Sequence, residues 1–152
     1  MSRLAWLAAG LAGASLMLSG CTQEHTENAR NGDDDQPARL VTVEGSQLKG
    51  VVLTARATER LGIKTEPVRE VPASGATTHE TAVPVAALVY DRKGEVWVYT
   101  STRPHRYVRE RVSVERIEGD LAILESGPPA GTAVVMVGAA ELLGTEYGVE
   151  GQ

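Results

Sequence analysis

The stretch VPVAALVYDRKGEVWVYT, residues 83–100, predicts a β-hairpin and sets the fold class of the chain. Apolar residues fill almost every position of 83–90, so both faces of a strand there should be at least half buried. Residues 91–94 supply turn chemistry, ending in Gly94, which can adopt a positive φ angle. Residues 95–100 then form the return strand, so the stretch indicates a β-rich domain.

Two aromatic residues of the return strand, Trp97 and Tyr99, fall on the same face because side chains alternate along a strand. We expect them to cover an aliphatic core, since isolated aromatic pairs mostly fill space; a ligand-binding platform is the alternative. The chain has no phenylalanine and only 4% aromatic residues. The remainder of the core must therefore be built from Val, Leu, Ile and Ala.

From Arg39 onward, short apolar runs alternate with Gly, Pro and charged turns, a pattern typical of an all-β domain. We expect a mainly β fold, a small β-barrel or β-roll of about six to eight short strands with one or two short helical turns, preceded by a disordered tether. The other expected strands are 39–44, 50–54, 63–71, 107–115, 121–126 and 132–138. We also expect a short helix over 55–62 and, over 139–148, a short helical turn that closes at Gly144 or an irregular tail.

The N-terminus has the features of a secretory signal peptide. Arg3 precedes an apolar stretch, and small residues follow it immediately before Cys21, the only cysteine. The apolar stretch is shorter than the roughly 20 residues that span a membrane. Residues 1–20 are therefore expected to be removed, and the chain then divides into a linker, 21–38, and a β-domain, 39–149.

The segment LSGC, ending at Cys21, resembles the lipobox of bacterial lipoproteins. The resemblance implies that Cys21 is acylated and becomes the new N-terminus; the alternative is an ordinary free thiol. Several acyl chains anchor a protein stably to a membrane. We expect a periplasm-facing, lipid-anchored membrane protein of a Gram-negative bacterium, and Thr22 leaves open whether the inner or the outer membrane holds it.

The linker is acidic and polar. It contains His25 and an aspartate run at 33–35, which we interpret as a solvated tether rather than a metal site, because nothing holds the ligands in place. The whole chain carries a formal net charge of −5, and loss of Arg3 makes the mature form more acidic still. Nucleic acid is therefore not an expected partner, since it requires a basic face.

Catalytic patterns are missing from the sequence. We find no phosphate-binding glycine loop, no paired histidines at helical spacing and no nucleophile elbow. His25, His79 and His105 all lie in polar or turn-like contexts and are expected to be solvated. We therefore expect a protein that is not an enzyme, with no catalytic residues, cofactor or metal.

Basic residues concentrate in RPHRYVRER, residues 103–111. Arg109 and Arg111 would share one strand face with Tyr107 beside them. One interpretation is a surface that contacts an acidic partner protein; the other, equally favoured, is a solvated edge whose charges discourage aggregation. The residues of this partner-binding hypothesis are Arg103, Arg106, Tyr107, Arg109 and Arg111.

Three segments carry a family resemblance: TERLGIKTEPV (58–68), the opening stretch (83–100) and GTAVVMVGAAELLGTEYG (131–148). They resemble periplasmic adaptor subunits, the HlyD-like membrane fusion proteins of resistance-nodulation-division (RND) efflux pumps. The chain departs from the family pattern at Glu115, where a glycine is usual, and at Pro128, where a leucine is common. The matching positions in the opening stretch are Val83, Pro84, Ala87, Leu88, Asp91, Gly94, Trp97, Val98 and Tyr99.

The spacing of these segments limits what the resemblance implies. Val68 and Val83 lie too close together for the β-barrel, lipoyl-like domain and helical hairpin that a full adaptor places between them. Only the membrane-proximal domain remains. In a full adaptor, the first and last pieces of the chain pair with each other in this domain. The resemblance thus implies a non-enzymatic lipoprotein that docks on an RND transporter or its full-length adaptor and assists transmembrane export. The alternatives are a stand-alone envelope lipoprotein and a carrier of a small ligand or metal.

Overall fold

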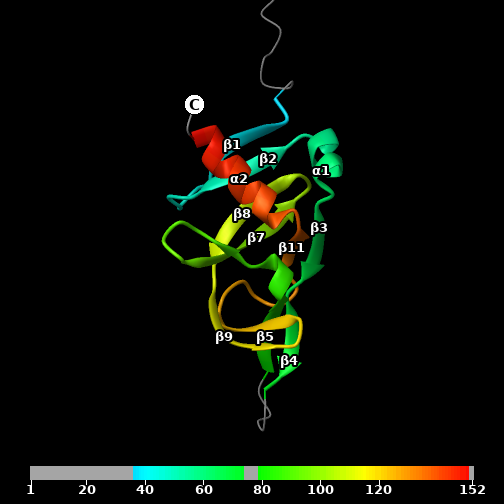
Figure 1. Ribbon diagram of the computed structural model, residues 1–152, viewed down its shortest axis with the longest axis vertical. Helices are drawn as coiled ribbons and strands as arrows, with labels where there is room; N and C mark the ends of the chain where they lie inside the picture. The colour runs from blue at the N-terminus through cyan, green and yellow to red at the C-terminus, as the bar shows by residue number, and fades with distance from the viewer. Residues whose placement is uncertain (1–35, 74–78, 151–152) are drawn as a thin grey trace, which may run out of the picture. The chain divides into compact units, whose positions relative to one another are not determined.

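The computed structural model describes residues 36–73 and 79–150, all within the unit Asn31–Gln152 (Figure 1). The expected signal peptide, Cys21 and the acidic linker up to residue 35 lie outside the described residues. The elements are β1 (Ala38–Thr42), β2 (Lys49–Leu53), α1 (Ala55–Leu61), β3 (Lys64–Pro67), β4 (Arg69–Pro72), β5 (His79–Pro84), the 3₁₀ turn η1 (Val85–Ala87), β6 (Val89–Tyr90), β7 (Val96–Arg103), β8 (Arg106–Arg111), β9 (Ser113–Glu118), β10 (Leu121–Ser126), β11 (Ala133–Val137) and α2 (Ala139–Glu150).

The described strands form two antiparallel sheets. The seven-stranded sheet has the order β1-β2-β8-β7-β11-β3, with β6 added beside β7, and the four-stranded sheet has the order β4-β5-β10-β9. The prediction of a mainly β domain is confirmed. The finer description was wrong, because eleven strands form two open sheets rather than six to eight strands forming a barrel or roll.

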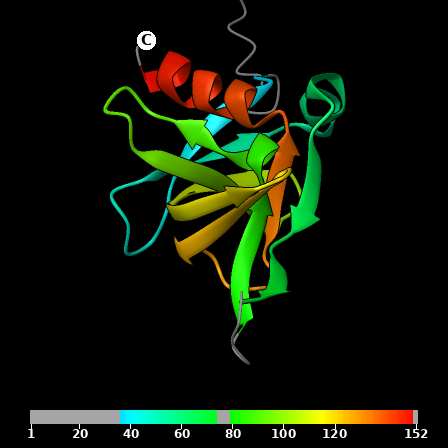
Figure 2. The same cartoon turned by 60° about the horizontal axis from the view of Figure 1, so that its bottom comes forward.

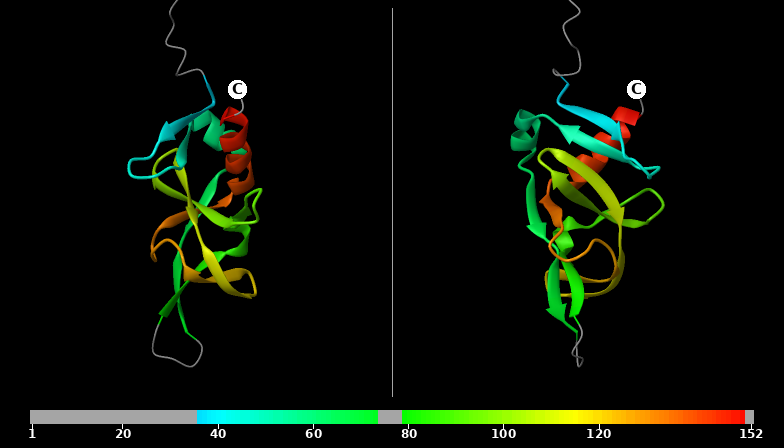
Figure 3. Two further views of the ribbon diagram at one scale, coloured as in Figure 1. Left: turned by 90° about the vertical axis from the view of Figure 1, so that its left-hand side faces the viewer. Right: turned by 180° about the vertical axis from the view of Figure 1, so that it is seen from behind.

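Both ends of the domain contribute to the seven-stranded sheet. Near the N-terminal end, β2 pairs with β8 through Val51 and Tyr107, and β3 pairs with β11 through Glu66 and Val134. Figure 3 shows these early strands beside late ones in both views. The first and last parts of the domain are thus joined through backbone hydrogen bonds rather than through side chains alone.

Strand β7 lies at the centre of the core, with a hydrophobic cluster on each of its faces. Trp97 and Tyr99 belong to the cluster that includes residues of both helices, whereas Val98 belongs to the cluster that includes residues of the four-stranded sheet. Trp97 is 9% exposed and Tyr99 is fully buried. The prediction that this aromatic pair covers the core is confirmed.

Three of the expected strands are each broken where the chain passes between sheets. The expected strand 63–71 divides into β3 in the seven-stranded sheet and β4 in the four-stranded sheet. The expected strand 83–90 ends at Pro84 in the four-stranded sheet, makes the turn η1, and resumes as β6 in the other sheet. The expected strand 107–115 likewise divides into β8 and β9 on either side of the buried Val112. A local apolar pattern does not distinguish one strand from two that belong to different sheets, because most apolar residues on both sides of the break are buried or half-buried in either case.

The turn of the opening stretch agrees with its prediction. Asp91 Oδ1 accepts hydrogen bonds from the backbone N–H groups of Lys93 at 2.8 Å and Glu95 at 2.9 Å. Gly94 has a φ angle of 78°, in the left-handed region that favours glycine. This turn joins the short strand β6 to the central strand β7.

The two helices differ in how well the sequence predicts them. Helix α1 is capped as expected, with Thr54 Oγ1 accepting from the N–H of Ala57 and Gly62 closing the helix in the left-handed conformation. Helix α2 is longer than predicted, because it continues through Gly144 instead of ending there. Figure 2 shows α2 lying across the strands of the seven-stranded sheet, where the buried Leu142 joins the core.

Candidate functional site

A buried carboxylate, Glu146, connects helix α2 to the seven-stranded sheet. Its side chain is 1% exposed and accepts a hydrogen bond of 2.6 Å from the hydroxyl of Tyr99 in β7. Arg109 in β8 places its Nε atom 3.1 Å from the other carboxylate oxygen. Buried charges are stable in proteins only when paired and hydrogen-bonded. Glu146 meets both conditions through Arg109 and Tyr99, whereas the Arg109 Nε atom makes the ion pair without hydrogen-bond geometry. These three residues are called the Glu146 cluster below.

The electrostatics of the Glu146 cluster favour a neutral Tyr99 beside a charged Arg109. Burial raises the pKa of Tyr99 far above its usual value, and the hydrogen bond to Glu146 raises it further. Burial alone would lower the pKa of Arg109, but attraction to Glu146 together with the contacts to Tyr147 and Tyr99 outweighs burial, and the pKa rises. The cluster therefore keeps one hydroxyl proton and one guanidinium charge facing one carboxylate.

Aromatic rings extend the cluster toward the surface. The guanidinium of Arg109 lies 4.8 Å from the ring centroid of Trp97 and 5.7 Å from that of Tyr147. Arg92, in the turn after β6, stacks on Tyr147 at 4.4 Å. Such cation–π contacts stabilise a packed arrangement. The Glu146 cluster is thus a structural attachment of α2, with no exposed nucleophile or base among its members.

The structure does not gather the five residues of the partner-binding hypothesis into one exposed surface. Tyr107 is 3% exposed and belongs to the core, and Arg109 forms an ion pair with Glu146. Arg111 is 65% exposed and lies 3.0 Å from Glu95. The shared face of Tyr107, Arg109 and Arg111 is real, but it faces inward toward α2 over most of its length.

Arg103 and Arg106 remain as the accessible pair. They lie opposite each other across the turn between β7 and β8. Both line a groove of about 460 Å³. The turn between β1 and β2 also lines this groove and contributes Glu44. Figure 1 labels the four strands from which these turns extend. The groove therefore presents two guanidinium groups beside one carboxylate.

His105 fixes the turn that carries these arginines. Its φ angle of 60° is in the left-handed region, which is uncommon outside glycine. Its ring Nδ1 atom lies 2.9 Å from the hydroxyl of Thr58 in α1, and its carbonyl accepts a hydrogen bond of 2.9 Å from the N–H of Leu53. His105 is half-buried and not the freely solvated residue that was expected, whereas His79 is exposed.

Comparisons with protein-family models, curated proteins and solved structures found no match.

Among the residues that the structure describes, neither helix is long and apolar enough to cross a membrane. In the same residues, no group of three or more His, Cys, Asp or Glu side chains is arranged to hold a metal ion. The concave surfaces of the described domain include the groove at Arg103 and Arg106 and a cavity between the two helices.

The Glu146 cluster is not among the predicted features, because the sequence predicts only a short helical turn or a tail over residues 139–148. The signal was present: Ala139, Leu142, Leu143 and Glu146 follow the i, i+3, i+4, i+7 spacing of one helix face. A glutamate at the last of these positions indicates a buried acid with a partner on the facing sheet. That partner is Arg109, which belongs to the basic segment 103–111 that the sequence predicts to be exposed.

Proposed function

We propose that this protein is a periplasm-facing lipoprotein, without catalytic activity, that docks on an RND efflux transporter or its full-length adaptor and assists export. The supporting observation is the pairing of the early strands β2 and β3 with the late strands β8 and β11. A membrane-proximal adaptor domain built from the first and last pieces of its chain would have this arrangement. Because Pro72 and His79 are the ends of adjacent paired strands, the domain is continuous without any inserted domain between them.

The docking surface that we propose is the groove at Arg103 and Arg106. Arg103 is exposed and Arg106 half-buried, and their guanidinium groups favour an acidic patch on the partner. Rim charges of this kind chiefly affect association rate and specificity, and their contribution is screened by salt. The groove adjoins the turn between β1 and β2, so a partner would contact both turns together.

The test is co-purification after mild crosslinking, with the protein co-expressed beside an RND transporter and its adaptor. The double reversal Arg103→Glu with Arg106→Glu should reduce capture of the partner several-fold, because like charges then face each other. Lys93→Glu is the matched control, since Lys93 is also an exposed cation in a turn. Equal capture of both variants, or no capture of transporter or adaptor by the unaltered protein, would overturn the docking proposal.

Lipid attachment is tested separately, because docking and anchoring can fail independently. Cells supplied with radiolabelled palmitate should incorporate label into the protein, and Cys21→Ser should abolish the incorporation. Cys21 is the sole cysteine, so no other thiol can take the label. Label retained by Cys21→Ser, or absent from the unaltered protein, would show that the lipobox resemblance misleads.

A further inference from the structure

A cavity of about 600 Å³ lies between α1 and α2. Its floor is apolar: Leu53 and Ala57 are buried, and Leu61 is half-buried. Gln36, where the described chain begins, and Pro37 also line the cavity. Sites for small molecules in proteins are concave, mostly apolar and about 300–1,000 Å³ in volume, and this cavity falls in that range.

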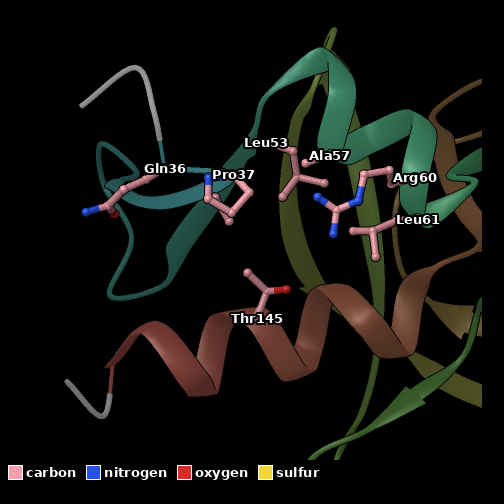
Figure 4. A pocket seen from close by; sticks show the side chains of 8 residues that line it. Gln36, Pro37, Leu53, Ala57, Arg60, Leu61 and Thr145 are labelled. Carbon is pink, nitrogen blue, oxygen red and sulfur yellow. The ribbon is translucent and has the colours of Figure 1, made fainter. Parts of the chain in front are cut away.

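The cavity has few polar side chains, and Arg60 is the one charged residue among its described lining residues. Figure 4 shows the Arg60 side chain extended from α1 over the space between the two helices, with Thr145 of α2 facing it. Among the described residues, no acidic side chain lines the cavity and no ion pair is formed by Arg60. The Thr145 hydroxyl donates to the carbonyl of Glu141 at 2.8 Å, so its oxygen can still accept or orient a polar group.

These features select one class of ligand. An apolar floor inside and a single cation at the exposed rim match a molecule with an apolar body and one anionic end. The cavity volume suits one acyl chain of moderate length rather than the two chains of a membrane phospholipid. We propose that this cavity binds a single-chain anionic amphiphile of the fatty-acid class, with its carboxylate at Arg60 and its chain against Leu53, Ala57 and Leu61.

Binding is measured on the chain that begins at Thr22, because every strand, helix and buried residue of the described domain lies at or after Ala38. A cooperative thermal transition first establishes that each variant is folded. Titration calorimetry then compares three probes below their micelle concentrations: dodecanoate, dodecyl maltoside and dodecyltrimethylammonium. The three probes have similar apolar chains, and their head groups are anionic, neutral and cationic, respectively. Dodecanoate should bind most tightly and the cationic probe most weakly, because Arg60 attracts the anionic head group and repels the cationic one.

Two variants and one control separate charge from shape. Arg60→Gln should weaken dodecanoate binding about three- to fivefold, as expected for a solvent-exposed ion pair, and leave the maltoside unchanged. Arg56→Gln, on the same helix but outside the cavity lining, should change neither. Thr145→Phe should weaken both probes together, since the larger side chain occupies the cavity.

Four results would overturn the proposal. They are equal affinity for the anionic and cationic probes, a loss with Arg56→Gln as large as with Arg60→Gln, no detectable dodecanoate binding, and binding to vesicles of anionic phospholipid in place of dodecanoate monomers. Because none of these probes involves a transporter, the outcome is independent of the docking proposal. The cavity can bind its ligand whether or not the arginine groove binds a partner.

Discussion

Removing one member of the Glu146 cluster should strongly destabilise the fold. Glu146→Leu leaves Arg109 as a charge that is only 14% exposed and without its carboxylate, and leaves the Tyr99 hydroxyl without its acceptor. Breaking a buried pair in this way typically costs 3–5 kcal/mol, and because Arg109 is not fully buried we expect about 3 kcal/mol. Arg109→Met should cost about as much, because the buried Glu146 carboxylate then loses the guanidinium group of Arg109.

The double variant distinguishes pairing from simple loss of packing. Glu146→Leu combined with Arg109→Met removes both charges, so it should cost at least about 2 kcal/mol less than the sum of the single changes. Arg111→Met is the control, since Arg111 pairs with Glu95 at the surface and exposed pairs contribute only about 0–1 kcal/mol.

Urea unfolding of the chain from Thr22 gives these free energies. Trp97 is the only tryptophan left in that chain, because the other, Trp6, lies in the expected signal peptide, so fluorescence reports on the cluster itself. Circular dichroism provides a second signal and a check on two-state behaviour. Additive single changes, or a loss for Glu146→Leu no larger than that for Arg111→Met, would refute the account of α2 attachment.

The remaining predictions use the same unfolding measurement or a titration. Stability should fall above pH 10, because the unfolded chain then releases the Tyr99 proton while the folded pKa stays higher; the loss should reach about 1.4 kcal/mol at pH 11 and be absent from Tyr99→Phe. Gly138→Ala should lower the free energy of unfolding by about 2 kcal/mol, because the φ angle is 90° and a Cβ atom would meet Ile63. Gly144→Ala should raise it by about 0.5–1 kcal/mol, because Gly144 lies within a helix and a Cβ atom there meets nothing. The reverse order of stabilities would contradict this. The hydrogen bond from Arg116 holds the pKa of Glu80 below its usual range, so NMR should show an acid-shifted Glu80 midpoint that returns to normal in Arg116→Gln, and an unchanged midpoint would refute the pairing.

Local patterns predicted the elements whose causes are local. The cap at Thr54, the closure at Gly62 and the turn from Asp91 to Gly94 all depend on side chains within a few positions. Burial of Trp97 also followed from strand alternation and the scarcity of other aromatic residues. These features need no knowledge of which sheet a strand joins.

Nonlocal features were not predictable in the same way. The break at Val85–Ala87 arises because β5 and β6 belong to different sheets. The alternation of apolar residues along the sequence does not indicate which sheet a strand joins. The arginines of 103–111 separate for a related reason. Arg109 meets Glu146 across the fold, and a strand pattern read alone assigns such a residue to solvent.

The docking account is tested most directly by site-specific photocrosslinking in the native envelope. A photoreactive residue replaces Arg103 in the groove, or Lys93 in the control turn, and the captured proteins are identified by mass spectrometry. The account predicts that the Arg103 position captures an inner-membrane efflux transporter or its full-length adaptor, and that the Lys93 position does not. Capture of neither protein from the Arg103 position, with transporter and adaptor present in the same membranes, would contradict it.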